Sequence, residues 1–182
     1  MPRTLFCLVA LSLAAVLSGC GQDATPLPKQ APANVQSRVA QIDARRAVIE
    51  EMRLQRHELS ASDLRPKVAQ KWSKLHVYTD DGTVLRIKSY PHAGISERTE
   101  EFYFTQGQLI LAVIEDEGID SNGDEDEDVD KMYYFDAEQV IFERRDDDEA
   151  EYGSLDTDGM ELLQEAREYL ELFKRQRSQP EP

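Results

Sequence analysis

The chain has 182 residues and a formal net charge of −15, because 36 Asp and Glu outnumber 21 Lys and Arg. This excess of negative charge repels nucleic-acid phosphates and anionic lipid headgroups, which excludes nucleic acid as a partner and membrane attachment through a basic patch. The length suits one ordinary domain with a hydrophobic core of its own.

The chain begins with a short apolar segment, from Leu5 to Val16, that follows the basic residue Arg3. About a dozen apolar residues are enough for a removable export leader and too few to span a bilayer. The segment ends in the tetrapeptide Leu-Ser-Gly-Cys at positions 17–20. A buried helix of the folded domain is the alternative, but it explains neither the small residues nor the cysteine that follows them.

The tetrapeptide at positions 17–20 resembles the lipobox of bacterial lipoprotein precursors. The resemblance implies that residues 1–19 are a signal peptide, that cleavage falls between Gly19 and Cys20, and that Cys20 is lipidated. Cys7 leaves with the leader, so the mature domain has no disulfide. Two or more acyl chains hold a protein durably at a bilayer, so we expect a membrane partner through the acyl chains on Cys20 and no spanning helix.

The residue after the lipidated cysteine bears on the membrane to which a lipoprotein is sorted. In the lipoprotein family, an aspartate at this position retains the protein at the inner membrane. Gly21 occupies the position here. The resemblance therefore implies a lipid-anchored protein of the cell envelope, at the periplasmic face of the outer membrane.

A proline-rich stretch follows the lipobox. Pro26, Pro28 and Pro32 stand among small and polar residues, so we expect residues 20–33, which begin with the lipidated cysteine, to form an extended tether. A single domain is then expected from 34 to 178, followed by a polar tail at 179–182 that frays.

The first element expected in this domain is an amphipathic helix that begins at the N-cap residue Asn34 and ends at Ser60–Asp63. A parallel coiled-coil dimer is the alternative, but Arg46 interrupts its apolar seam. Pro66 suits the first turn of a short second helix. The apolar residues at helical spacing are Val35, Val39, Ile42, Ile49 and Met52.

Three β-hairpins are expected in the middle of the chain, because segments rich in β-branched and aromatic residues alternate with short turn sequences. Residues 102–104 (Phe-Tyr-Phe) recur as 133–135 (Tyr-Tyr-Phe), each before a polar turn, so the hairpins form an internal repeat. They resemble repeats of uncharacterised bacterial envelope lipoproteins, which implies a fold but no binding residues. The paired segments are Leu75–Tyr78 with Thr83–Tyr90, Glu101–Phe104 with Gln108–Ile114, and Met132–Phe135 with Gln139–Glu143.

A C-terminal amphipathic helix is expected to cover one face of the sheet. The segment Leu109–Ile114 is apolar on both faces, which predicts a central strand that is covered on both sides or meets a partner. The predicted fold is thus α+β, with one or more N-terminal helices, an antiparallel meander of about six strands and the C-terminal helix. The apolar residues of that helix are Leu162, Leu163, Ala166, Tyr169, Leu170 and Phe173.

An acidic segment between the second and third hairpins alternates oxygen ligands with other residues, as does the opening of an EF-hand calcium loop. The match then fails, because Glu125, Glu127 and Lys131 stand where that loop needs a glycine, an apolar residue and a bidentate acid. We therefore expect a solvated loop and no cofactor, with calcium binding as the alternative. The candidate metal ligands are Asp120, Asn122, Asp124, Asp126 and Asp128.

The sequence lacks the usual signatures of a catalytic site. His57, His76 and His92 are dispersed and match no metal-ligand spacing, and no serine stands in a Gly-x-Ser-x-Gly elbow. Two carboxylates that approach each other in the fold are the remaining route to a hydrolase such as a glycosidase. We therefore expect no enzyme, with a calcium-binding or hydrolytic envelope protein built around the acidic loops as the alternative.

Tyrosines are the best candidates for a partner-binding face. Tyrosines that share a sheet face offer amphipathic contact area to an envelope protein or a glycan, and the alternative is cross-strand packing beneath a helix. We expect a binding or adaptor module, and the acidity of the chain favours a basic partner. The candidate residues are Tyr78, Tyr90, Tyr103, Tyr133 and Tyr134.

Overall fold

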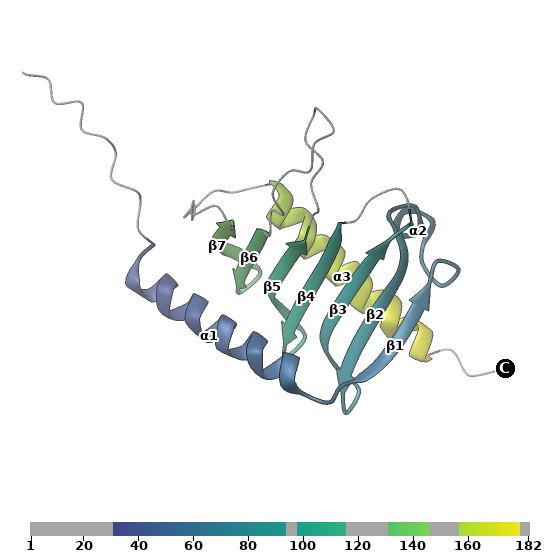
Figure 1. The fold of residues 1–182 in the computed structure, drawn as a ribbon, viewed down its shortest axis with the longest axis horizontal. Helices are drawn as coiled ribbons and strands as arrows, with labels where there is room; N and C mark the ends of the chain where they lie inside the picture. The colour runs from purple at the N-terminus through teal and green to yellow at the C-terminus, as the bar shows by residue number, and fades with distance from the viewer. Residues whose placement is uncertain (1–30, 94–97, 116–130, 146–156, 179–182) are drawn as a thin grey trace, which may run out of the picture.

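The computed structural model describes residues 31–93, 98–115, 131–145 and 157–178. Over these ranges the chain forms a seven-stranded antiparallel sheet and three helices, which confirms the α+β class (Figure 1). The strands lie in the sheet in chain order, as a meander. The elements are α1 (Ala33–Glu51), β1 (Gln55–Ser60), α2 (Pro66–Lys71), β2 (Trp72–Asp80), β3 (Thr83–Pro91), β4 (Thr99–Thr105), β5 (Gln108–Glu115), β6 (Lys131–Asp136), β7 (Gln139–Arg145) and α3 (Thr157–Ser178).

All three predicted hairpins are present, and each closes with a two-residue turn. Both turn residues have positive φ in each case: 46° and 78° at Asp81-Gly82, 53° and 78° at Gln106-Gly107, and 47° and 64° at Ala137-Glu138. Two positive φ angles are typical of the type I′ turn, whose twist matches that of the flanking strands. Glycine adopts this conformation without steric cost, which explains Gly82 and Gly107 at the second position.

The hairpins of the internal repeat predicted from the sequence also share a register shift in their strand pairing. Each hairpin has a register shift, after Tyr78 in β2, after Tyr103 in β4 and after Tyr134 in β6. Cross-strand partners share a sheet face, and Tyr78, Arg86, Tyr103, Leu111 and Tyr134 are successive partners in one row across the sheet. The three tyrosines therefore occupy equivalent positions on the same face.

The prediction that the first helix ends at Ser60–Asp63 is wrong. Strand β1, which the sequence pattern does not predict, occupies the last part of the expected helix. α1 ends at Glu51, and Met52 has an extended backbone with φ −71° and ψ 146°. From Gln55 to Ser60 the chain pairs with β2 instead. Only Leu59 of this edge strand is buried, so the local sequence carries too weak an apolar alternation to predict a strand.

The sheet has a hydrophobic core on each of its faces. α3 crosses one face diagonally, behind the sheet in the view of Figure 1, and α1 packs on the other face against β5 and β7. In β5, Leu111 and Val113 belong to the core under α1, whereas Ala112 and Ile114 belong to the core under α3. This arrangement confirms the predicted central strand that is covered on both sides.

Both long helices bury the residues that their spacing predicts, except that Met52 lies just beyond the end of α1 and is only partly buried. In α1 the buried residues are Val35, Val39, Ile42 and Ile49, and all six apolar residues predicted for α3 are buried. None of the helices in the described ranges is long and apolar enough to cross a bilayer.

Candidate partner-binding face

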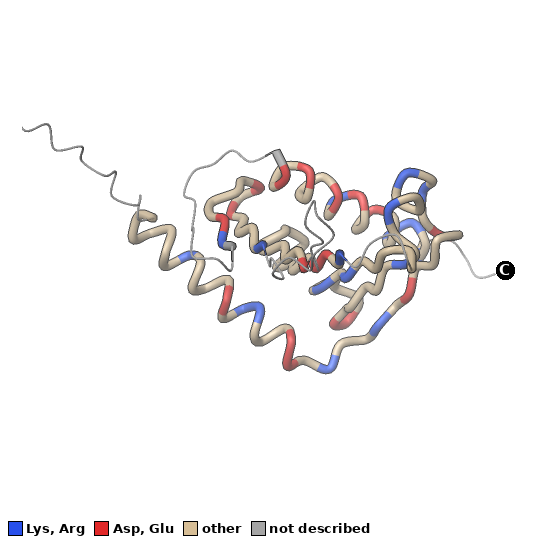
Figure 2. Tube along the Cα trace, turned by 45° about the horizontal axis from the view of Figure 1, so that its top comes forward, with Lys and Arg blue, Asp and Glu red and all other residues tan. Residues whose placement is uncertain are grey.

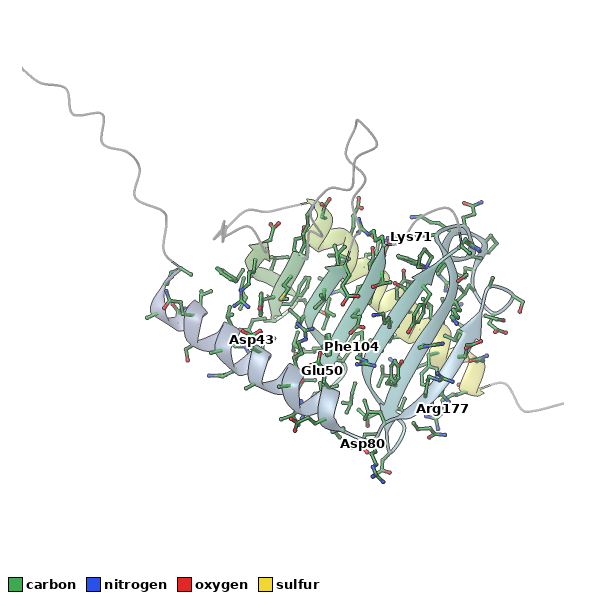
Figure 3. All side chains as sticks on the ribbon, viewed as in Figure 1. Asp43, Glu50, Lys71, Asp80, Phe104 and Arg177 are labelled. Carbon is green, nitrogen blue, oxygen red and sulfur yellow. The ribbon has the colours of Figure 1, made fainter. Side chains whose placement is uncertain are left out.

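α1 covers only part of its face of the sheet. It packs over β5 to β7 and over Tyr103 of β4, and no described helix covers the larger part of β1 to β3 on this side (Figures 1 and 3). We call this uncovered surface the open face. Its side chains alternate along the strands and face one another across them: Arg56, Glu58, Ser60, Lys74, His76, Tyr78, Arg86, Lys88 and Tyr90.

Cationic side chains of the open face lie over aromatic rings. The guanidinium carbon of Arg86 is 4.1 Å from the centre of the Tyr78 ring, and Lys74 Nζ is 5.1 Å from the centre of the Tyr90 ring. The His76 ring lies between these pairs, 4.6 Å from the Tyr90 ring and 6.3 Å from the Tyr78 ring. The aliphatic stems of Arg and Lys shield the sheet from water where no helix does so, and their charged ends stay at the surface.

The open face belongs to a basic region of an otherwise acidic protein. Residues 53–93 contain eight Lys and Arg against four Asp and Glu, whereas the whole chain carries a net charge of −15. In Figure 2 these basic residues gather at the end of the molecule formed by β1 to β3 and α2. Four of these cations, Arg56, Lys74, Arg86 and Lys88, lie on the open face, and two carboxylates, Glu58 and Glu101, lie on the same side of the sheet, so this surface is net positive in contrast to the whole chain.

Of the four cations on the open face, only Lys88 has an ion-pair partner among the described residues. It lies 2.7 Å from Glu101 and 3.2 Å from Glu115. Burial lowers the pKa of Lys88, but the two carboxylates outweigh this effect and raise the pKa overall. The cations without an ion pair among the described residues are Arg56, Lys74 and Arg86, although Glu101 attracts Arg86 through space.

His76 is the buried centre of the open face. Its side chain is 8% exposed, its Nε2 lies 3.0 Å from Glu58 Oε2, and its Nδ1 has no hydrogen-bond partner in the described structure. Burial lowers the pKa of His76, and the positive charges of Lys74 and Arg56 lower it further. The imidazole is therefore neutral near pH 7, and the positive charge of the open face comes from lysine and arginine alone.

The five candidate tyrosines occupy three different environments. Tyr78 and Tyr90 lie half-buried on the open face. Tyr103 and Tyr134 share that side of the sheet but are fully buried under α1, and Tyr133 is fully buried under α3. Fully buried rings cannot contact a partner, so the predicted face is corrected to Tyr78 and Tyr90, and the other three pack beneath helices.

The remaining candidate residues either lie outside the described residues or are dispersed within them. Gly19, Cys20 and the candidate calcium ligands Asp120, Asn122, Asp124, Asp126 and Asp128 lie outside the described residues. His57 faces α3 and His76 faces the opposite side of the sheet, while His92 bonds to the backbone of α2. Within the described ranges, no three His, Cys, Asp or Glu side chains gather as metal ligands.

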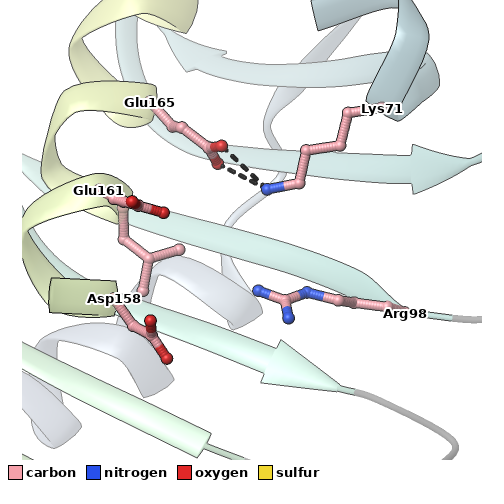
Figure 4. A pocket seen from close by; sticks show the side chains of 6 residues that line it. Lys71, Arg98, Asp158, Glu161 and Glu165 are labelled. Atoms are coloured by element: carbon pink, nitrogen blue, oxygen red, sulfur yellow. Dashed lines mark hydrogen bonds and ion pairs between the residues drawn. The ribbon is translucent and has the colours of Figure 1, made fainter. Parts of the chain in front are cut away.

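A second candidate site is a charged cavity of about 280 Å³ beside the first half of α3 (Figure 4). Lys71 Nζ lies 2.9 Å from Glu165 Oε1 on its wall and 3.0 Å from Oε1 of the neighbouring Glu100. Arg98 Nη2 lies 2.8 Å from the same Glu100 oxygen. The cavity is lined by Lys71, Arg98, Asp158, Glu161, Leu162 and Glu165.

Glu100 and Glu165 are the kind of neighbouring carboxylates that the hydrolase alternative requires. Burial and the negative charge of Glu100 raise the pKa of Glu165. The Glu100 side chain is 0% exposed, however, so it cannot touch a substrate in the cavity. Both carboxylates bind the same lysine, and the cluster therefore ties α2, β4 and α3 together rather than flanking a scissile bond.

Comparison with known proteins returns no match: no protein family, no curated protein and no solved structure is similar to this chain. The functional argument therefore depends on the geometry of the open face. Sequence reasoning identified Tyr78 and Tyr90 but missed Arg56, Lys74 and Arg86. The overlooked signal is the basic composition of residues 53–93 within an acidic chain.

Proposed function

We propose that this protein is a lipid-anchored lipoprotein of the cell envelope that acts as a non-catalytic binding or adaptor module, with the open face as its partner surface. One observation carries the binding role. A sheet face that α1 covers elsewhere is left without a helix over β1 to β3 in the described part of the chain, and stacked tyrosines and cations form the surface there. Aromatic and arginine side chains are the groups that contribute most to protein interfaces.

The envelope location depends on the lipobox resemblance at positions 17–20. Acyl chains on Cys20 would hold the protein at the membrane, and the tether at 20–33 would let the domain stand away from the headgroups. The outer membrane remains the proposed location, because Gly21 follows the cysteine. The anchor and the open face have separate roles, so separate variants test them.

The binding role is tested by photocrosslinking in the native envelope. A benzophenone amino acid at Tyr90 reports on the open face, and the same group at Gln164, which is exposed on α3, is the matched control. We expect a defined crosslinked partner from position 90 and none from position 164. The purified partner should then bind the lipidated protein and lose affinity when Tyr90 is replaced by alanine. Equal crosslinking from both positions would contradict a partner surface on the open face.

The anchor is tested by Cys20→Ser in the full-length chain. We expect the variant to appear in the soluble fraction after cell disruption, with the wild type in the membrane fraction, because the serine side chain cannot receive a thioether-linked lipid. A Cys7→Ser variant is the matched control and should remain in the membrane fraction. Retention of Cys20→Ser in the membrane despite an intact leader would refute the lipoprotein proposal.

A further inference from the structure

Two of the three hairpins share a unit of one tyrosine, one arginine and one carboxylate. In the second hairpin, the Tyr103 hydroxyl donates a 2.8 Å hydrogen bond to Glu50. Arg46 lies over the Tyr103 ring at 5.5 Å and pairs with Glu50 at 2.8 Å. The carboxylate of Glu50 thus accepts a hydrogen bond from the tyrosine and neutralises the charge of the arginine above the ring.

The tyrosine of the third hairpin lies in a similar cluster, although its arginine comes from β7 rather than from α1. The Tyr134 hydroxyl donates a 2.8 Å hydrogen bond to Asp43. Arg144 lies over the Tyr134 ring at 5.3 Å and is 3.5 Å from Asp43. Asp43 and Glu50 both come from α1, where they are two turns apart and therefore on one side of the helix.

The first hairpin has only two of the three groups. Tyr78 occupies the equivalent position before the register shift, and Arg86 lies over its ring at 4.1 Å. α1 ends at Glu51, and its Glu50 attracts Arg86 through space but makes no ion pair with it. Among the described residues, no carboxylate pairs with Arg86 or accepts a hydrogen bond from Tyr78, and the buried Arg86 Nε has no partner.

The carboxylates Glu58 and Glu101 on this side of the sheet are already engaged, and Glu58 lies 3.0 Å from His76. The Tyr103 hydroxyl oxygen also lies 2.7 Å from Glu101, so its one proton is shared between Glu50 and Glu101, and Glu101 pairs with Lys88 at 2.7 Å. It adds a Coulombic attraction to Arg86 without an ion pair. The first hairpin therefore keeps a positive charge and an unpaired donor at the place where the other two hairpins receive an acid from α1.

We infer that the open face binds an acidic amphipathic helix of a partner polypeptide, which places a carboxylate on Tyr78 and Arg86 as α1 does on the other two units. The inference rests on the proposed function and specifies the chemistry of the partner. Arg56 and Lys74, which flank the Tyr78 unit, add to the attraction for acidic side chains. The basic partner expected from the overall acidity does not match this local charge.

The dimensions of the open face suit one helix. Adjacent strands lie about 4.8 Å apart, so β1 to β3 span roughly 10 Å, and an α-helix with its side chains is about 10 Å across. The half-buried Tyr90 ring and the stems of Lys74 and Arg86 provide apolar contact beside the charges. A helix in this position would complete the layer that α1 begins.

The test uses the full-length lipidated protein in nanodiscs of zwitterionic phospholipid. The probe is a fluorescein-labelled, lysine-free and arginine-free amphipathic helix with two glutamates one heptad apart, beside its apolar stripe. A matched peptide carries glutamine at both positions. We expect fluorescence anisotropy to show binding of the glutamate peptide at least tenfold tighter than that of the glutamine peptide, and weaker at high salt.

Three variants locate the binding site of the probe. Tyr78→Phe removes one hydroxyl and should weaken binding of the glutamate peptide severalfold. Arg86→Gln should abolish the difference in affinity between the two peptides. Lys67→Gln, which removes an exposed cation on α2 outside the open face, is the control and should leave affinity unchanged. Circular dichroism and urea unfolding establish that each variant is folded.

The outcomes separate this inference from the proposed function. Equal affinity for the two peptides, no binding of either, or no effect of Tyr78→Phe and Arg86→Gln would overturn the acidic-helix partner. Binding to anionic phosphatidylglycerol vesicles without binding to the glutamate peptide would overturn it in favour of a lipid surface. A position-90 crosslink to an envelope protein would still support the binding role in each of these cases.

Discussion

Trp72 Nε1 donates a 2.6 Å hydrogen bond to the Tyr169 hydroxyl, and both side chains are almost completely buried. The bond joins the first residue of β2 to the middle of α3. The Tyr169 ring also meets Phe102 of β4 edge to face, with centroids 5.5 Å apart. Tyr169 therefore fixes α3 to the sheet through an aromatic contact and a buried polar contact at once.

We predict that Tyr169→Phe destabilises the protein by about 1–3 kcal/mol, because the buried Trp72 indole N–H loses its acceptor. Urea unfolding followed by circular dichroism measures the change. Trp72→Phe and the double variant complete a double-mutant cycle. The double variant should lose less unfolding free energy than the sum of the losses in the two single variants. A Tyr169→Phe variant as stable as the wild type would show that the hydrogen bond contributes nothing net.

Glu165 should make the stability of the folded protein depend on pH. Burial and the charge of Glu100 raise its pKa above the ordinary value of 4.5, while Lys71 opposes this shift. A raised pKa means that the folded state holds the proton more tightly than the unfolded state. The stabilisation is therefore complete below pH 4.5 and is lost as the pH rises through the raised pKa.

We predict that the unfolding free energy of the wild type minus that of Glu165→Gln decreases as the pH rises from 4 to 8, because glutamine carries no titrating proton. Urea unfolding at a series of pH values measures both proteins in the same buffers. Glu171→Gln, on the same helix with a side chain that is 60% exposed, is the control for the loss of a surface charge. A difference that stays constant or increases with pH would contradict the raised pKa.

Gly159 should be intolerant of a methyl group, although alanine is the better helix former. A Cβ at this position would lie 2.6 Å from Val140 Cγ2 and 3.3 Å from Tyr133 Cδ1. We predict that Gly159→Ala lowers stability by about 1–3 kcal/mol, because overpacking outweighs the helix propensity gained. Val140→Ala removes the closest atom, so adding it to Gly159→Ala should restore part of the loss. If thermal unfolding shows that Gly159→Ala is stabilising, the close packing of α3 on β7 is refuted.

The acidic segment leads to a prediction about cations. If it is only a solvated loop, calcium and magnesium should shift the melting temperature equally, as charge screening requires. An Asp124→Asn/Asp126→Asn variant should then unfold like the wild type in calcium and in chelator. A melting shift with calcium alone, lost in the double variant, would establish the calcium-binding alternative.

Local sequence determined the hairpins, their turns and the two long helices, because each depends on contacts within a short stretch of chain. Gly82 and Gly107 mark two of the turns, and the apolar spacing in α1 and α3 specifies which side of each helix is buried. The recurrence of aromatic triplets at 102–104 and 133–135 likewise indicates equivalent hairpins. These features need no knowledge of the tertiary structure.

Only the tertiary structure decided the rest. β1 exists because β2 offers its edge to a segment whose own pattern is too weak to specify a strand. The sequence also places Tyr78, Tyr103 and Tyr134 in equivalent positions, yet two of them are buried and one is half-exposed. The physical reason is that α1 ends at Glu51 and docks over the last hairpins, and the docking of a helix depends on distant strands that no local pattern encodes.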